Sequence, residues 1–257
     1  MEICTIRGSH PVIRAILSAA EQIAATDVCA LIIGEKGTGK ELLARHIHAV
    51  SPRAAGPFVR VDCQDLVLLR GGRDLRAALD TSSEAGTVAA LLERAHGGTL
   101  FLDQLAALST ELQARLLSAL LGCAVDVRLL AARDPLETGA SCLAAAGLAL
   151  VEIPVPALRQ RRSDIPVLVE HFLELYARRH GVGVRRIETE AMVLLWQYDW
   201  PGNVRELESV VERVVVLSRS GIIRPADLPP HIGVVKAKSS AGAGSRGNGH
   251  AAFALRH

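Results

Sequence analysis

Apolar runs of four to six residues alternate with amphipathic stretches along the first ~155 residues of the chain. Such runs are typical of strands that are buried on both faces of a sheet. The expected strands cover residues 30–33, 58–61, 99–102, 127–132 and 150–155. Apolar residues at helical spacing predict helices over residues 41–50 and 111–121. Alternating strands and helices predict an α/β fold in which helices flank a parallel sheet.

The pattern changes after Pro156, where helical spacing predicts three successive helices and no further strand. These helices begin near residues 163, 189 and 203, and Glu206, three residues after Asn203, predicts a capping box at the third. We therefore expect an α/β core over residues 1–157 and a small all-helical domain over residues 158–233. Residues 234–257 are rich in Ser, Gly, Ala and Arg and bury too little apolar surface to fold, so a flexible tail is expected.

Composition narrows the class of protein without indicating a ligand. Hydrophobic residues make up 49% of the chain and aromatic residues 3%, so the core is expected to consist of Ala, Val, Leu and Ile. The net charge of +2 neither favours nor excludes a nucleic-acid partner. The 5 cysteines form no Cys-x-x-Cys pair, which favours free thiols in a reducing compartment over metal ligands. A signal pattern and an apolar run of about 20 residues are both missing, so a soluble, cytoplasmic protein without membrane contact is expected.

A glycine-rich loop follows the first expected strand and precedes the first expected helix. It consists of Gly34, Glu35, Lys36, Gly37, Thr38, Gly39, Lys40 and Glu41. The glycines allow backbone N–H groups to turn toward phosphate oxygens, while the helix N-terminus and the ammonium group of Lys40 add positive charge. The loop predicts a Walker A site for a nucleotide phosphate, with a tight turn that binds nothing as the alternative. Glu41 replaces the usual magnesium-binding Ser or Thr.

Three further motifs follow this loop in a specific order. The four motifs are GEKGTGKE at 34–41, GGTLFLD at 97–103, LRQRRSDI at 158–165 and WPGNVREL at 200–207. Together they resemble the AAA+ domain of bacterial sigma-54-dependent transcriptional activators, and the similarity extends from about residue 6 to residue 232. The resemblance implies an α/β ATPase core with a helical lid, usually assembled as a ring.

The resemblance also implies roles for individual residues. Residues 34–41 resemble the loop that holds the phosphates of ATP or ADP. Asp103 resembles the Walker B carboxylate, which holds magnesium through bound water. Arg205 resembles the sensor arginine that reaches from the lid to the nucleotide, with an exposed helix residue as the alternative.

Several departures from the family pattern indicate weak catalysis. The glutamate that polarises the attacking water is replaced by Gln104, which cannot accept a proton, and the loss of a general base costs about 10²–10⁴ in rate. Residues 140–150, where the family has arginine fingers worth roughly 10³–10⁵, contain no arginine. The Thr-Asn pair of a further sensor, expected after Ala132, is either replaced by Arg133 and Asp134 or deleted. Hydrolysis is therefore expected to be negligible, so that an enzyme is not the favoured interpretation.

Asp62 and Gln104 form a second departure, because amide and carboxylate have exchanged positions. The family has Asn at the first position and Glu at the second, and the two side chains hydrogen-bond as a switch. We predict that Asp62 and Gln104 still form a hydrogen bond, so that a nucleotide-sensitive contact is kept without a correctly located base. Independent drift of the two positions is the alternative.

The expected function is that of a binding module. The Gly-Ala-Phe-Thr-Gly-Ala loop that contacts sigma-54 has no equivalent between residues 80 and 94. An ATP- or ADP-binding regulatory protein is therefore expected, with an AAA+ homologue or a signalling complex as its protein partner. DNA is not expected as a partner on its own, because only the tail follows the lid. A slow ATPase that activates sigma-54-dependent transcription is the alternative, and a scaffold that binds no nucleotide is a third interpretation.

Overall fold

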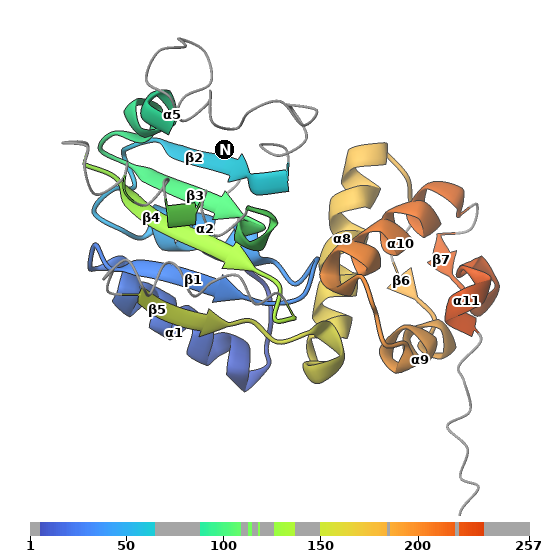
Figure 1. Ribbon diagram of the computed structural model, residues 1–257. Coiled ribbons are helices and arrows are strands. Elements are labelled where there is room, and N and C mark those ends of the chain that lie inside the picture. The colour runs from blue at the N-terminus through green and yellow to red at the C-terminus, as the bar shows by residue number, and fades with distance from the viewer. Residues whose placement is uncertain are drawn as a thin grey trace, which may run out of the picture.

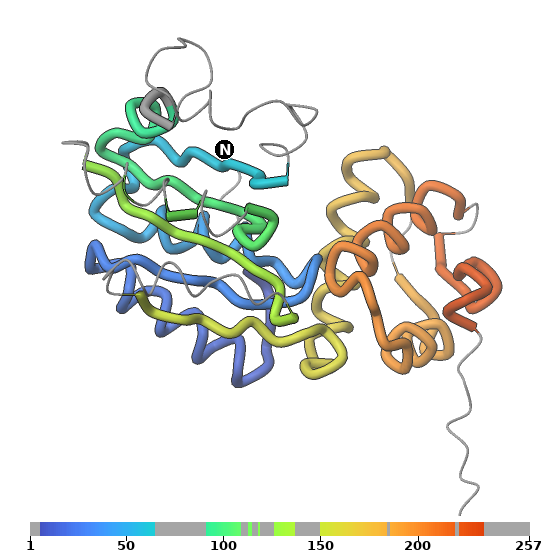
Figure 2. The backbone as a smooth tube through the Cα atoms, in the orientation of Figure 1, coloured from blue at the N-terminus to red at the C-terminus, as the bar shows by residue number. Residues whose placement is uncertain are grey.

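The computed structural model describes residues 6–64, 88–108, 113–114, 118, 126–136, 150–183, 186–218 and 221–233. Figure 1 shows an α/β unit beside a smaller, mostly helical unit. Figure 2 follows the chain from the last strand of the sheet directly into the second unit. The two-part architecture predicted by the hydrophobic pattern is thus confirmed.

A five-stranded parallel sheet forms the centre of the first unit, in the order β2-β3-β4-β1-β5. The strands are β1 (Cys29–Ile33), β2 (Phe58–Asp62), β3 (Thr99–Asp103), β4 (Arg128–Arg133) and β5 (Leu150–Pro154). Each coincides with one of the expected apolar runs, with bounds that differ by one residue at one end or, for β4, at both ends. Because all five strands are parallel, their carboxyl ends meet at one edge of the sheet, and Asp62 lies opposite Asp103 in the register of β2 and β3.

Helices cover both faces of this sheet (Figure 1). On one face, α1 (Pro11–Ala24) and α2 (Lys40–Ala49) pack against alternate strand residues such as Ala30 and Ile32. On the other face, α5 (Val88–Ala95) packs against residues such as Leu31. The alternation along β1 therefore divides a core of small aliphatic side chains between two layers. The sequence pattern did not lead us to expect α1 or α5.

The second unit contains η2 (Leu158–Gln160), α8 (Asp164–His180), α9 (Thr189–Gln197), α10 (Asn203–Leu217), η3 (Pro225–Asp227) and α11 (Pro230–Gly233). Its core surrounds Trp200, which is fully buried and donates its indole N–H to the carbonyl oxygen of Leu195 at 2.8 Å. The unit is helical as predicted, with one addition. Short strands β6 (Arg186–Ile187) and β7 (Ile222–Ile223) pair in parallel.

Some expectations fall on residues outside the described part of the chain. These are most of the helix over 111–121, all but the last residue of the arginine-free segment 140–150, the segment 65–87 and the tail from 234. In the described part, Cys29 and Cys63 are free cysteines, in keeping with the expected thiols. None of the described helices has the length and hydrophobicity needed to span a bilayer.

Candidate nucleotide-binding site

The glycine-rich loop connects β1 to α2 at the carboxyl edge of the sheet. Gly37 and Gly39 adopt left-handed backbone conformations, with φ of 80° and 100°, which favour glycine. The ammonium group of Lys40 donates hydrogen bonds to the carbonyl oxygens of Gly34 at 2.6 Å and Glu35 at 3.1 Å. Since α2 begins at Lys40, the N–H groups of its first turn and the positive end of its dipole lie at the same place. The loop therefore has the backbone and the charge of an anion-binding site.

The first turn of α10 docks directly on this loop. The backbone N–H groups of Val204 and Arg205 both donate to the carbonyl oxygen of Gly37, at 3.0 and 3.3 Å. A Cβ atom at Gly37 would lie only 2.2 Å from the carbonyl oxygen of Gly202, so this close approach requires glycine. Arg205 thus lies at the phosphate-binding loop, where the resemblance puts the sensor arginine. Its guanidinium forms no hydrogen bond or ion pair with the residues that the structure describes.

Asn203 joins the lid to the loop through its side chain, and this corrects the predicted capping box. Glu206 does accept a hydrogen bond from the N–H of Gly202 at 2.8 Å, as a capping glutamate would. The buried Asn203 side chain, however, does not cap its own helix. Its oxygen accepts from the N–H of Leu158 at 2.8 Å, and its nitrogen donates to the carbonyl oxygen of Lys36 at 3.0 Å. Tertiary hydrogen bonds have replaced the local cap.

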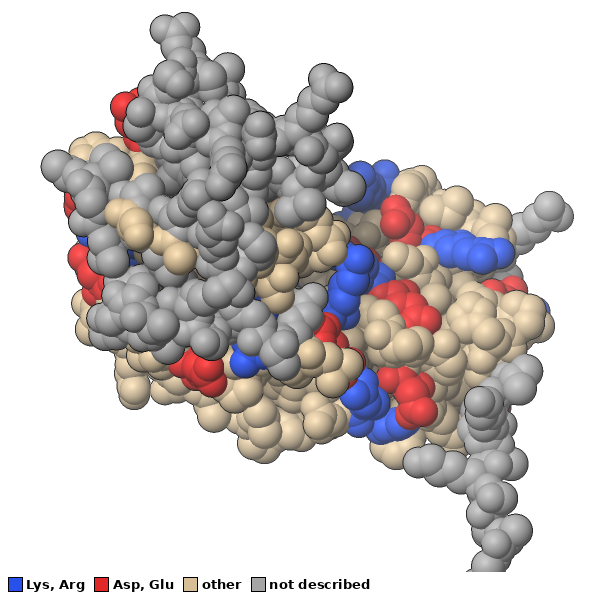
Figure 3. Space-filling view, in the orientation of Figure 1, with Lys and Arg blue, Asp and Glu red and all other residues tan. Residues whose placement is uncertain are grey.

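Two arginines just after β5 add charge to this contact between loop and lid. Arg159 donates to the carboxylate of Glu35 at 2.8 Å, and the nearly buried Arg161 donates to the carbonyl oxygen of Thr38 at 2.9 Å. The hydrogen bond from Arg159 lowers the pKa of Glu35 to about 2, with burial opposing the shift and Asn203 adding to it. Figure 3 shows charged side chains of both signs along the junction of the two units. Four successive loop residues, 35–38, are therefore hydrogen-bonded to the lid.

The pair of Glu35 and Arg159 predicts a measurable dependence of stability on pH. The pKa of Glu35 in the folded protein, about 2, lies below its ordinary value of 4.5. The pair therefore stabilises the fold fully above pH 4.5 and loses this effect as the pH falls toward 2. We expect wild type to be more stable than Glu35→Gln near neutral pH, and the difference to shrink as the pH falls through this range. Urea unfolding of both proteins at a series of pH values measures it, and a difference that is constant with pH would contradict the assignment.

A second group of polar residues lies where β2 and β3 end. The side-chain amide of Gln104 donates to both carboxylate oxygens of Asp62, at 3.1 and 3.0 Å, which confirms the predicted hydrogen bond. Asp62 also accepts from the backbone N–H of Gln64 at 3.0 Å. Gln104 has a φ of 55°, which is uncommon for a residue other than glycine. The amide of Gln104 is therefore held on a carboxylate in the position where the family has a base.

The carboxylate of Asp103 has a cationic side chain as its partner. It forms an ion pair with Arg60, whose Nη2 lies 3.0 Å from Asp103 Oδ2. The same guanidinium pairs with Glu41 at 3.1 Å, so the residue that replaces the magnesium-binding hydroxyl is also engaged. Within the described ranges, no group of three or more His, Cys, Asp or Glu side chains is arranged so that it could hold a metal ion. The predicted role of Asp103 in holding magnesium through water stays a prediction, and in this structure Arg60 occupies the carboxylate that would serve it.

An apolar pocket of about 110 Å³ lies beside the loop, and the sequence pattern gave no sign of it. It is lined by Ile6, Ile13, Leu17, Leu43, Val155 and Phe172, together with Thr38 and Gly39 of the loop. Its walls come from the N-terminal segment, α1, α2, the end of β5 and α8. An apolar pocket next to a phosphate-binding loop suits a flat ring that is linked to phosphate. The apolar stripe of α1, which includes Ile13 and Leu17, is the sequence signal that could have predicted the part of the pocket wall formed by this helix.

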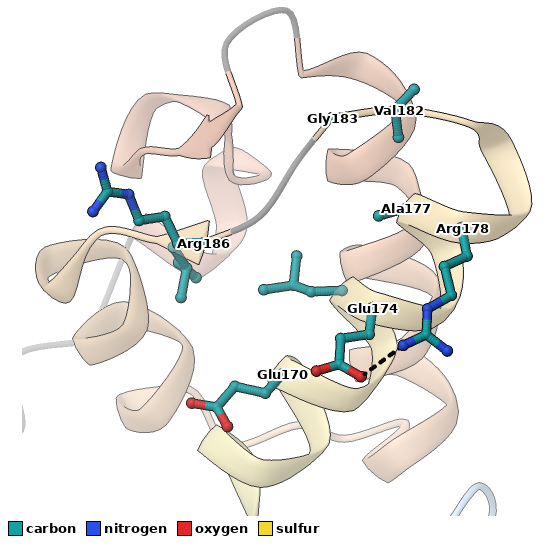
Figure 4. Close-up of a pocket in the computed structure, with 9 residues that line it drawn as sticks. Glu170, Glu174, Ala177, Arg178, Val182, Gly183 and Arg186 are labelled. Carbon is teal, nitrogen blue, oxygen red and sulfur yellow. Dashed lines mark ion pairs between the residues drawn. The ribbon is translucent and has the colours of Figure 1, made fainter.

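A larger pocket, of about 600 Å³, opens on the lid and has a different chemistry (Figure 4). Glu170, Glu174, Arg178 and Arg186 line it, and Glu174 pairs with Arg178 at 3.7 Å along the surface of α8. Both partners of that pair are mostly exposed to solvent. With charges of both signs and no phosphate-binding loop, this pocket does not belong to the nucleotide site.

Comparison with known proteins agrees with this geometry. Residues 6–134 match the family model of the sigma-54 interaction domain, and residues 159–244 match that of the AAA+ ATPase lid domain. The transcriptional regulatory protein ZraR of Escherichia coli (strain K12) is 40% identical over 246 residues, covering 86% of this chain and 55% of ZraR. The nitrogen fixation protein VnfA of Azotobacter vinelandii is 37% identical over 247 residues, covering 88% of this chain and 47% of VnfA. The chain thus spans about half the length of these curated relatives.

Solved structures show the same relationship. NtrX from Brucella abortus in complex with ATP has a TM-score of 0.74 and 32% identity, covering 90% of this chain and 58% of NtrX. The complex of the same protein with ADP has a TM-score of 0.72 and 30% identity, covering 89% and 56%. The four sequence motifs, the sheet with its helical lid and the matched family models therefore agree. The chain belongs to the family of sigma-54 interaction domains, the AAA+ domains of sigma-54-dependent transcriptional activators.

Proposed function

We propose that this chain is a regulatory module that binds ATP or ADP and hydrolyses ATP too slowly for turnover to drive its action. The observation that supports this most is the hydrogen bond from Gln104 to Asp62. This hydrogen bond holds the amide of Gln104, which is a hydrogen-bond donor and cannot act as a base, next to the Walker B residue Asp103. Nucleotide then acts as a ligand that holds loop and lid together.

Nucleotide binding is supported by two features of the site and by the solved structures of a similar protein. The loop provides backbone N–H groups and Lys40 for phosphates, while the adjoining apolar pocket suits a base. The similar NtrX structures are complexes with ATP and with ADP. A free nucleotide concentration of about 100 times the dissociation constant would stabilise the folded chain by about 2.7 kcal/mol.

The proposed mode of action is contact with another protein. Members of the family act in transcription, and this chain lacks the Phe-Thr motif of the sigma-contacting loop. An AAA+ homologue, whose ring this chain would join or block, and a signalling complex are the partners that the fold suggests. Such a partner would be met in the cytoplasm, where transcription factors of this kind work. The nucleotide would control the contact by setting the position of the lid relative to the loop.

Binding and turnover can be measured separately on the same purified chain. Calorimetric titration with ADP is expected to detect saturable binding, while phosphate release from ATP is expected to stay at the background rate. Absence of nucleotide binding to the folded chain would exclude the proposal. Sustained phosphate release that depends on Lys40 would instead favour the alternative, a slow ATPase that activates sigma-54-dependent transcription.

A further inference from the structure

Arg60 extends from the middle of β2 toward the first turn of α2. Its neighbours Val59 and Val61 face the layer that contains α5, so Arg60 faces the opposite side of the sheet. Arg60 Nη2 lies 3.0 Å from a carboxylate oxygen of Asp103 and 3.4 Å from one of Asp62, while Arg60 Nε lies 3.1 Å from Glu41. One cation therefore contacts three carboxylates that come from three different elements.

The guanidinium of Arg60 lies between two of the motifs that the family resemblance assigns to the nucleotide site. Glu41 directly follows Lys40, so it belongs to the first turn of the helix that the phosphate loop precedes. Asp103 ends the strand that bears the Walker B motif. The guanidinium thus lies between the phosphate loop and the Walker B carboxylate, which is the region where the family resemblance would put a divalent cation. Three carboxylates here would repel a polyphosphate strongly if no cation offset their charge.

Building on the proposed nucleotide binding, we propose that Arg60 is the resident cation of this site and makes the binding of ADP or ATP independent of magnesium. The guanidinium neutralises Asp103 in place of a metal ion with its water shell. Its side chain remains 36% exposed, and its ion pairs engage Nε and Nη2. The remaining N–H groups would donate to a phosphate oxygen. Such bonds between guanidinium and phosphate are charge-assisted and therefore strong.

Arg45 provides the matched comparison. It pairs with Glu41 at 2.8 Å and is also partly exposed. Among the described residues, however, Arg60 is the cation within ion-pair distance of Asp103, and Arg45 has no contact with that carboxylate. Removal of either arginine costs one positive charge near the loop. Of the two removals, only that of Arg60 also deprives the Walker B carboxylate of Asp103 of its ion-pair partner.

The test is a titration of the full chain with ADP, once with excess magnesium and once with EDTA. We expect the two affinities of wild type to agree within about threefold. In Arg60→Ala, EDTA is expected to weaken binding by about tenfold or more relative to magnesium, because a bond to a charged group is lost and the freed carboxylate then needs a metal ion. Arg45→Ala is expected to behave as wild type does.

Each outcome bears on the proposal. A wild-type affinity that falls tenfold in EDTA would overturn it, since magnesium would then be the cation. Equal affinities of Arg60→Ala in magnesium and EDTA would overturn it too, because Arg60 would have no role in the balance of charge. Both results leave the proposed nucleotide binding intact. Absence of ADP binding to folded wild type under either condition would exclude the proposed function and, with it, this inference. Circular dichroism confirms that each variant is folded.

Discussion

Replacement of Lys40 by alanine is expected to lower the affinity of the chain for ADP by about a hundredfold. The ammonium group already lies 2.6 Å from the carbonyl oxygen of Gly34, the first residue of the loop. Truncation of one partner of a close charge pair costs about 2–5 kcal/mol, and about 2.7 kcal/mol corresponds to a hundredfold change. Isothermal titration calorimetry with ADP measures the difference between the two proteins.

Arg178→Ala is a suitable control for this experiment. It also removes one positive charge, from a side chain that is 83% exposed on α8. Its affinity for ADP is expected to equal that of wild type. If Lys40→Ala bound ADP as tightly as this control did, the loop would not be the phosphate site and a nucleotide would have to bind elsewhere.

The second large effect concerns the contact between Asp62 and Gln104. Gln104→Glu would bring two carboxylates within about 3 Å of each other, at the distance of the present hydrogen bond. Loss of a hydrogen bond to a charged group costs about 2 kcal/mol, which corresponds to a melting temperature lower by about 4–8 °C. Asp62→Asn keeps a neutral hydrogen bond, and we expect it to cost about 1 kcal/mol.

The double variant Asp62→Asn/Gln104→Glu completes the cycle. It reverses the exchange of amide and carboxylate, so the hydrogen bond can form again with donor and acceptor swapped. We expect its melting temperature to return close to that of wild type. The effects of the two substitutions would then not add, which shows that the two positions interact. Melting followed by circular dichroism gives all four values. Additive effects of the two substitutions would show that the positions do not interact and that their exchange reflects independent drift.

The strands and the phosphate loop could be predicted because both depend on local sequence. Parallel strands with two buried faces require continuous apolar runs, such as residues 99–102, and these are visible without any tertiary information. The loop follows a strand and precedes a helix, and its glycines are needed at fixed spacing, so Gly37 and Gly39 were found from their positions. The contact between Asp62 and Gln104 could be predicted because the family resemblance pairs those two positions.

The parts that were missed depend on how the elements pack. Arg60 looks like an ordinary exposed strand residue, and its partners become evident only when β2 pairs with β3 and α2 lies over them. The ion pair between Asp103 and Arg60 was missed for the same reason. Asn203 matched a local capping pattern, but the approach of the lid to the loop gave its amide better partners. The apolar pocket draws its walls from distant segments, so no single stretch of sequence could indicate it.

The attachment of α10 to Gly37 has a mechanical consequence. This helix has 15 residues and is therefore about 22 Å long. Two backbone N–H groups in its first turn donate hydrogen bonds to a single carbonyl group of the loop. If α10 tilted by about 10° about its first turn, its C-terminal end would move by about 4 Å. A rearrangement of the loop that tilted this helix would therefore be amplified along its length and would displace residues at the outer end of the lid.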